Sequence, residues 1–306
     1  MQLSSIKISI VICTYNRAQY LPEAFDSLHH QTIDKQLYEI IVVNNNSTDN
    51  TAEVCEAHIK KYTDLSITYL LETKQGASFA RNTGANIAKG ELLCFMDDDA
   101  IAYPDYVEKI IRFFDETPDA GGLGGRIIPR YIPAEPKWMS RFVSSLVGNF
   151  DYSKEVVVFS ENKYPLESNM IIRKKDFDAV GGFNINLPGV QGTLRIGGEG
   201  KEFFFKLKAL GRTIYYHPQV IVEHVVETQK LTPEYLYRVA SGIGRGERVR
   251  TKAISTISFY KKVGEYYYKF AGAIVLAIIY LLKGTPAKMK PVIQFRIDAL
   301  KGLLGY

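Results

Sequence analysis

Three consecutive carboxylates, Asp97-Asp98-Asp99, directly follow the strand-like segment Glu91–Met96. Adjacent carboxylates repel one another, and a bound cation removes this cost. Mg²⁺ and Mn²⁺ prefer oxygen ligands, and they bind one or two protein carboxylates together with substrate phosphates. The triplet therefore predicts a divalent-metal site for a phosphorylated ligand. The alternative is a solvated acidic turn before the helix expected after Pro104.

The segments that must position this triplet alternate between strand-like and helix-like patterns. Strands are expected at Lys7–Thr14, Tyr38–Val43, Ser66–Leu71 and Glu91–Met96, and helices at Leu21–His30, Thr51–Tyr62 and Ser78–Ala88. This alternation predicts an open, mostly parallel α/β sheet flanked by helices, and ligands of such sheets bind outside the carboxyl ends of the strands. Three polar clusters lie at those ends: Thr14–Arg17, Asn44–Asp49 and Asp97–Asp99.

Beyond Pro104 the pattern is looser. Further strands are expected at Gly121–Pro129 (with tight turns), Leu166–Arg173, Thr213–Tyr216 and Val220–Val226, and a helix at Glu202–Leu210. With 306 residues, 46% hydrophobic and 23% charged, the composition is globular and excludes a disordered chain. The three cysteines are widely spaced, which predicts buried thiols in a reducing compartment. No secretory signal pattern is present near the N-terminus, so we expect a cytoplasmic protein.

The last quarter of the chain differs in charge from the rest. Residues 1–227 carry 24 Lys/Arg and 29 Asp/Glu, whereas residues 228–306 carry 14 and 4, a net charge of +10. The segment Phe270–Leu282 has 13 uncharged residues and would span roughly 20 Å, short of a ~30 Å hydrocarbon core. We expect a helical tail that lies in the interface of the cytoplasmic membrane. The alternative is packing on the body or on a second subunit, as in a homodimer.

Seven motifs resemble those of family 2 glycosyltransferases of the GT-A fold, in the expected order. They are VICTYNR (Val11–Arg17), EIIVVNNNSTDNT (Glu39–Thr51), GASFARNTGANIAKGE (Gly76–Glu91), FMDDDA (Phe95–Ala100), ESNMIIRKKDFDAVGGF (Glu167–Phe183), GGEGKEFFFKLKALG (Gly197–Gly211) and YYHPQVIVEHVV (Tyr215–Val226). The resemblance implies a catalytic domain over residues 1–230, with a nucleotide-binding half (1–100) and an acceptor half (101–230), followed by the tail at 231–306.

The resemblance also implies the residues that bind the donor nucleotide. They are Thr14, Tyr15, Arg17, Asn44, Asn46, Arg81, Asp97 and Asp98. Asn44 stands where the family usually has an Asp that accepts a hydrogen bond from uracil, and an Asn carbonyl can accept the same bond. A UDP-sugar is therefore the expected donor. The metal, Mn²⁺ or Mg²⁺, would be held by Asp99 with Asp97 and His224, although a lone histidine is more often structural.

The general base of an inverting transfer is less clearly marked. By resemblance it belongs to a Glu-Asp or Glu-Glu pair before a helix, and here the pair reads Glu199-Gly200. Glu199 is the first candidate and Glu202 the second. The alternative role of both is to place negative charge at the N-terminus of a helix, where it complements the helix dipole. The expected acceptor and sugar pocket includes Asn169, Trp138 and Asp151.

These features predict a metal-dependent, inverting glycosyltransferase acting on a glycan or lipid-linked glycan of a cell-surface polysaccharide. Glycine stands at position 200, where the resemblance implies an acid. The alternative is therefore a scaffold protein that binds a sugar nucleotide without catalysis. A nucleotidyltransferase is disfavoured because the first loop, CTYNRAQY, contains no glycine. Nucleic-acid binding is not expected, because the basic tail carries no nucleic-acid motif.

Overall fold

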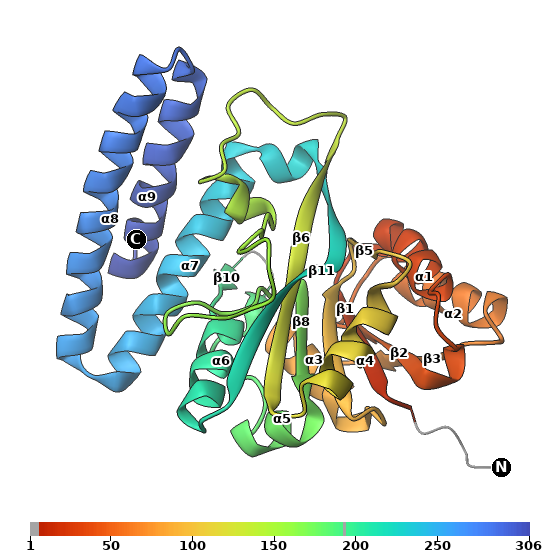
Figure 1. The fold of residues 1–306 in the computed structure, drawn as a ribbon. Helices are drawn as coiled ribbons and strands as arrows, with labels where there is room; N and C mark the ends of the chain where they lie inside the picture. The colour runs from red at the N-terminus through yellow and green to blue at the C-terminus, as the bar shows by residue number, and fades with distance from the viewer. Residues whose placement is uncertain (1–5, 192–193) are drawn as a thin grey trace. The chain divides into compact units, whose positions relative to one another are not determined.

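The computed structural model describes residues 6–191 and 194–306. It divides into two compact units. Unit 1 comprises Met1–Ile128, Phe150–Asn184 and Gly200–His224, and unit 2 comprises Pro129–Asn149, Ile185–Glu199 and Val225–Tyr306. The fold is the mixed α/β arrangement that the strand and helix alternation predicts (Figure 1).

The first half of unit 1 is a parallel sheet in the order β3-β2-β1-β4. Its strands are β1 (Ile8–Thr14), β2 (Tyr38–Asn44), β3 (Ser66–Leu71) and β4 (Leu92–Asp97). The residues of β1 and β2 are almost all buried, as expected for parallel strands covered on both faces. The helices are α1 (Leu21–His29), α2 (Thr51–Lys61), α3 (Ala77–Ile87) and α4 (Tyr106–Glu116). All four strands and α1–α3 lie within one or two residues of their predicted bounds.

The second half of the sheet combines two long strands, β6 and β11, with three short ones. After β4 the order continues β8-β6-β11-β5, and β4 pairs antiparallel with β8. These elements are β5 (Ala100–Ala102), β6 (Ala120–Ile132), β7 (Val157–Val158), β8 (Asn169–Arg173), α5 (Lys174–Val180), α6 (Glu199–Ala209) and β11 (Thr213–Glu227). Two predictions were wrong here. The glycines of β6 lie within a continuous strand instead of tight turns, and the two strands expected at 213–226 are one strand, β11.

The glycines of β6 allow close packing. A β-carbon on Gly125 would lie 2.2 Å from the Asn169 side-chain amide and from the Val220 carbonyl oxygen, and one on Gly124 would lie 2.8 Å from Pro165. Only glycine permits this approach, so the glycine-rich sequence reflects crowding between strands rather than turns.

Unit 2 is largely helical. It contains the antiparallel strand pair β9 (Gly189–Gln191) and β10 (Leu194–Ile196), the helix α7 (Pro233–Ile254), and the long helices α8 (Thr256–Leu282) and α9 (Met289–Leu304). Helices α8 and α9 lie side by side and antiparallel (Figure 1). Among the described residues, α8 is the helix long and apolar enough to cross a membrane by length and composition, and only 17% of its most apolar window is buried.

Helix α9 is buried on a different side from its most regular apolar row. The sequence places Ile293, Ile297, Leu300 and Leu304 on one face. The buried residues are instead Val292, Phe295, Asp298, Ala299, Gly302 and Leu303. A β-carbon on Gly302 would lie 2.0 Å from the backbone oxygen of Ser241 in α7. Helix α9 therefore packs against α7 through close backbone contact at Gly302, together with apolar side chains such as Val292, Phe295 and Leu303.

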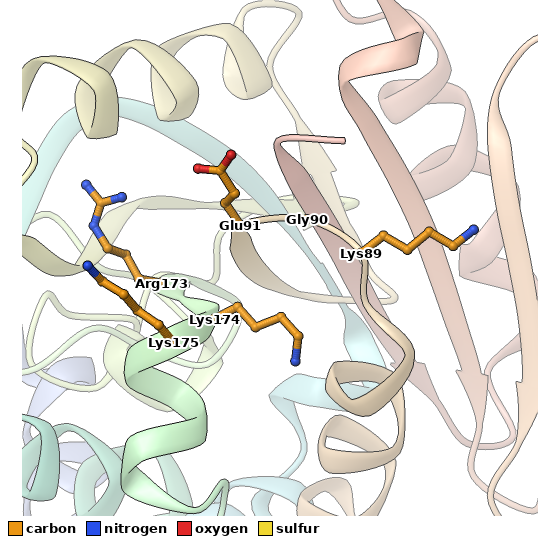
Figure 2. A pocket seen from close by; sticks show the side chains of 6 residues that line it. All are labelled: Lys89, Gly90, Glu91, Arg173, Lys174 and Lys175. Atoms are coloured by element: carbon orange, nitrogen blue, oxygen red, sulfur yellow. The ribbon is translucent and has the colours of Figure 1, made fainter. Parts of the chain in front are cut away.

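A small pocket of about 350 Å³ lies at the amino end of β4, at the opposite edge of the sheet from Asp97 (Figure 2). It is lined by Lys89, Gly90, Glu91, Arg173, Lys174 and Lys175. The Arg173 guanidinium donates hydrogen bonds to the carbonyl oxygens of Ala120, Phe114 and Thr117, so its charge is used to hold the end of α4. Arg173 therefore has a structural role in this pocket.

Candidate active site

The register of the parallel strands brings three predicted site residues to one edge. Thr14 pairs with Asn44 across β1 and β2, and Cys13 pairs with Asp97 across β1 and β4. Thr14, Asn44 and Asp97 are the last residues of their strands, and neighbouring parallel strands end at a common edge. The polar clusters that follow β1, β2 and β4 therefore meet at the carboxyl edge, as predicted.

The acidic triplet is compensated by two arginines. Arg17 Nη1 lies 3.1 Å from Asp98 Oδ1, and Arg17 also forms an ion pair with Asp99 Oδ2. Arg81, from α3, lies 3.8 Å from Asp97 Oδ1. Asp98 and Asp99 are 2% and 1% exposed, so neither carboxylate could remain charged there without such partners.

Asp97 is held as a carboxylate by its neighbours. Burial raises the pKa of Asp97, but Arg81, His224, Arg17 and a hydrogen bond from Ser168 Oγ (2.5 Å) together bring it below its ordinary value. Sequence reasoning missed Ser168. Its position one residue before the predicted site residue Asn169 was the only available signal.

His224 reaches the triplet through an antiparallel pairing that is distant in sequence. In the register of β11 and β5, His224 pairs with Ala100, the residue after Asp99. Its Nε2 lies 3.1 Å from Asp99 Oδ1. Asp97, Asp99 and His224 each offer one ligand atom, and these atoms lie within 4.8 Å of one another. Two carboxylate oxygens and one imidazole nitrogen this close together form a donor set that fits a divalent cation.

The end of β1 carries a polar atom that fits a ligand contact. Thr14 is 2% exposed, and its hydroxyl oxygen has no hydrogen-bond partner among the described residues. A buried hydroxyl without a partner costs free energy, so the Thr14 hydroxyl is available to a bound group or a water. Tyr15 and Arg17 follow in the same loop, and the Arg17 guanidinium lies 4.9 Å from the centre of the Tyr20 ring.

The loop after β2 is fixed by its asparagines. Asn44 Oδ1 accepts a hydrogen bond from the Ser47 backbone (2.8 Å), and its Nδ2 donates to the Tyr69 hydroxyl (3.0 Å). Asn46 is exposed and has a left-handed backbone conformation with φ of 64°. The neighbouring Asn45 was not among the predicted site residues, yet its Oδ1 accepts a bond from Gly76 N (2.6 Å) at the start of α3. Asn45 thus joins two of the loops at the carboxyl edge.

A second tie holds the first loop. Asn16, also left-handed with φ of 51°, accepts a bond from the Thr48 backbone (2.7 Å), and its own backbone donates to Ser47 Oγ (2.9 Å). Asp49 accepts a bond from the Ala18 backbone (3.1 Å). Asn and Asp tolerate left-handed turns and bond to nearby backbone groups. The loops that carry Arg17 and Asn44 are therefore rigidly joined.

The two candidate bases lie in the first turn of α6. Glu199 is its first residue and is buried. Glu202 accepts a hydrogen bond from Asn184 Nδ2 (3.0 Å) and forms an ion pair with Lys206 (3.1 Å) one turn later. Glu202 is therefore engaged in holding α6.

The three predicted acceptor residues have different local environments. Asn169 is fully buried, accepts a bond from the Tyr106 hydroxyl (2.9 Å) and donates to the carbonyls of Arg126 and Val220 (3.0 Å each). The Asn169 side chain thus joins strands inside the sheet, and its place in an acceptor pocket stays a prediction. Asp151 pairs with Arg126 (3.1 Å) in unit 1, whereas Trp138 packs in the core of unit 2.

The three cysteines do not take part in this chemistry. All are free thiols, and burial raises the pKa of Cys13, Cys55 and Cys94 to about 12 each. Buried thiols with such pKa values are poor nucleophiles and poor metal ligands.

Comparisons with known proteins agree with this arrangement. The model of glycosyl transferase family 2 matches residues 9–181. A glucosyl-dolichyl phosphate glucuronosyltransferase of Haloferax volcanii is 27% identical over 228 residues, which cover 72% of this chain and 69% of that protein. The succinoglycan biosynthesis protein ExoM of Rhizobium meliloti is 24% identical over 256 residues, 83% of this chain and 78% of its own length.

Solved structures show the same fold. The mannosyltransferase PcManGT of Pyrobaculum calidifontis, in complex with GDP-Man and Mn²⁺, superposes with a TM-score of 0.67 over 99% of this chain and 90% of its own, at 18% identity. TarS of S. aureus (residues 1–349) in complex with UDP gives a TM-score of 0.51 over 98% of this chain and 92% of its own, at 17% identity.

Proposed function

Because the chain belongs to glycosyl transferase family 2, we propose that it transfers a sugar, with inversion, from a nucleotide-diphosphate donor to a hydroxyl of a glycan or lipid-linked glycan. A UDP-sugar is the first candidate donor, and the product would enter a cell-surface polysaccharide. The observation that carries the proposal is the cluster of Asp97, Asp99 and His224 at the carboxyl edge of the sheet.

A divalent cation bound by this cluster would stabilise the negative charge that develops on the leaving diphosphate. Asp97, Asp99 and His224 would hold it. The imidazole nitrogen favours Mn²⁺ over Mg²⁺, because the harder Mg²⁺ strongly prefers oxygen ligands.

The chain's own residues would orient the nucleotide. Thr14 offers its unpartnered hydroxyl, and Arg17 and Arg81 bring positive charge to the edge where the diphosphate would lie. Asn44 Oδ1 already accepts one bond and has a second lone pair for a base N–H. These groups are held by the hydrogen bonds between loops, so they are preorganised for binding.

A binding panel tests this proposal. Thermal shift and calorimetry with UDP, GDP, CDP and ADP, each with Mn²⁺, with Mg²⁺ and with EDTA, should show one preferred base and binding that weakens at least tenfold in EDTA. Release of the diphosphate from the matching nucleotide sugar should follow the same preference. Equal binding of all four nucleotides, or binding indifferent to EDTA, would contradict the assignment.

A scaffold role without catalysis is the second candidate, because Gly200 replaces an expected acid. It predicts tight, metal-dependent nucleotide binding with no diphosphate release and no transfer to any glycoside. The same panel therefore separates the two candidates.

We further infer that the enzyme works at an anionic membrane surface, which it contacts with one face of α8. This face consists of Ile257, Tyr260, Tyr268, Val275, Ile278 and Leu282, and we call it the α8 face. Tyr268 and Leu282 are each 81% exposed. Intervals of three, four, seven and eight residues place these side chains along one side of the helix for about 38 Å.

The opposite side of α8 is buried, so the helix has two distinct sides. Tyr266, Ala273 and Ala277 repeat at intervals of seven and four residues and are 2–6% exposed. Lys269 lies between the two sides, and Lys262 lies toward α7, 3.8 Å from Glu247; both pair with Glu265. A helix with an apolar face, tyrosines and lysines at its border is typical of segments that lie in a membrane interface.

Charge favours a lipid surface over a second copy of the chain. Residues 256–306 carry eight Lys/Arg and two Asp/Glu, a net charge of +6. Two copies that met through the α8 face would bring two such charges together, whereas anionic lipids would neutralise them.

Vesicle flotation of the full chain tests this surface. Binding to phosphatidylcholine vesicles with 30% phosphatidylglycerol should exceed binding to pure phosphatidylcholine at least tenfold, and should weaken in 0.5 M NaCl. No binding to either vesicle, together with a dimer in light scattering, would assign the α8 face to a second copy.

A further inference from the structure

We propose that Glu167 is the general base of the transfer, and this proposal depends on the glycosyltransferase function proposed above. Inverting transfer needs a group that takes the proton from the acceptor hydroxyl as it attacks. Glu167 comes from the segment just before β8, far in sequence from the two glutamates of α6 that sequence reasoning selected.

The carboxylate of Glu167 occupies the place that a side chain at position 200 would take. The Gly200 N–H donates a hydrogen bond to Glu167 Oε1 (3.2 Å). A β-carbon built on Gly200 would lie 2.5 Å from that oxygen and 2.9 Å from the carboxyl carbon. The acid absent from position 200 is therefore matched by an acid that arrives at the same point from another segment.

The same segment contacts the acidic triplet. Ser168, the residue after Glu167, donates a hydrogen bond from Oγ to Asp97 Oδ2 (2.5 Å). Asn169, the next residue, is anchored inside the sheet by three hydrogen bonds. Glu167 is thus fixed one residue away from a group that touches the candidate metal site.

The first turn of α6 suits a carboxylate that must stay ionised. Free N–H groups and the helix dipole favour negative charge there. Glu202 is held by Asn184 and Lys206, and Asp151 by Arg126 and Lys154, so both of these acids are committed elsewhere. Glu199, the residue before Gly200, is the remaining alternative.

The proposed step balances without another reactant. The acceptor oxygen forms a bond to the anomeric carbon of the sugar while the bond from that carbon to the diphosphate oxygen breaks. The electron pair of the broken bond leaves with the nucleoside diphosphate. The hydroxyl proton passes to a carboxylate oxygen of Glu167, which later releases it to solvent.

The first experiment replaces the carboxylate by its amide. In Glu167→Gln, diphosphate release from the preferred sugar nucleotide, with water or an alkyl glycoside as acceptor, should fall about 10²–10⁴-fold, the usual contribution of a general base. Binding of the nucleotide with Mn²⁺ should change less than about threefold. The exposed Glu161→Gln is the matched control and should behave as wild type.

The second experiment moves the acid to the place that the geometry marks. Gly200→Asp alone should be poorly active, because its side chain collides with Glu167 and repels it. The double variant Glu167→Ala/Gly200→Asp should turn over the donor at least tenfold faster than Glu167→Ala alone. A carboxylate that only capped α6 would not give this recovery, since capping does not accelerate proton transfer.

The outcomes separate this proposal from the function itself. If wild type turns over a donor and Glu167→Gln keeps its rate within threefold while Glu199→Gln loses it, Glu199 is the base and Glu167 is not. Failure of the Gly200→Asp rescue, with normal folding and nucleotide binding, would also overturn the proposal. If wild type releases no diphosphate from any donor, the glycosyltransferase function fails first.

Discussion

Most proteins bury apolar side chains and expose charged ones. The carboxyl edge of the sheet in unit 1 instead buries acidic side chains, and the α8 face in unit 2 exposes apolar ones. At the edge, Asp98 and Asp99 are charged and almost fully buried. On the α8 face, Val275 and Leu282 are apolar and 57% and 81% exposed. Charged groups are rarely buried unless paired, and large exposed apolar surfaces mark interaction sites.

The two regions differ in how strictly their geometry is determined. Each carboxylate of the triplet has a defined partner, such as Arg17, Arg81 or Ser168. The α8 face needs only continuous apolar area with basic residues beside it, because burial of apolar surface is not directional. Single substitutions should therefore have large effects at the edge and smaller, cumulative effects on α8.

The largest expected effect concerns the interior beside the edge. Asn169→Ala removes three hydrogen bonds and leaves the Arg126 and Val220 carbonyls without this partner. Unfolding in urea should show a loss of about 3 kcal/mol, since each unsatisfied buried group costs about 1–3 kcal/mol. The exposed Asn162→Ala is the control and should change stability by less than about 0.5 kcal/mol. An equal loss of unfolding free energy in Asn169→Ala and Asn162→Ala would refute the structural role of Asn169.

The second effect concerns the metal. Asp99→Asn should weaken Mn²⁺ binding, measured by electron paramagnetic resonance with UDP or GDP present, about 100-fold, because one charged ligand beside His224 is lost. Asp119→Asn, at an exposed position, should leave it unchanged. Unaltered Mn²⁺ binding in Asp99→Asn would exclude this cluster as the metal site.

The third effect concerns the membrane surface. Val275→Glu combined with Ile278→Glu should weaken binding to vesicles with 30% phosphatidylglycerol about 30-fold, since each buried aliphatic side chain contributes about 1.5–3 kcal/mol at most. Leu210→Glu alters a similarly exposed leucine in unit 1, 52% exposed, and should bind as wild type. If the double variant and Leu210→Glu lose the same affinity, the net charge of the protein and not the α8 face governs binding to the vesicles.

A smaller effect tests the charge balance at the edge. The three aspartates with Arg17 and Arg81 sum to −1, and Arg17→Gln makes the sum −2. Mn²⁺ without nucleotide should then bind about fivefold more tightly, a change of about 1 kcal/mol for a partly exposed pair. Arg112→Gln, an exposed pair with Glu116, serves as control. Weaker Mn²⁺ binding would mean that Arg17 mainly orients Asp99.

The smallest effect sharpens the contrast between the two regions. Leu282→Gln on the exposed end of α8 should change the free energy of unfolding of the protein in solution by less than about 0.5 kcal/mol, because the side chain is 81% exposed. A loss of more than about 1 kcal/mol would show that Leu282 packs within the folded chain and is not part of an open face.

The sequence by itself determined the first half of the sheet and the edge where chemistry occurs. Apolar runs of strand length alternate with helical segments, and the polar residues that end them fall at one edge in any parallel arrangement. Thr14, Asn44 and Asp97 could therefore be placed together before any coordinates. The basic charge and the apolar segment of the tail were also legible, because composition does not depend on packing.

Only the tertiary structure decided the contacts between distant segments. The register of β11 on β5 brings His224 to Asp99, and close packing of β6 against β8 turns Asn169 inward. Glu167 and Gly200, which lie 33 residues apart in the sequence, are joined by a hydrogen bond. No local pattern encodes such pairings, because they follow from which strands and helices pack together and how closely their backbones can approach.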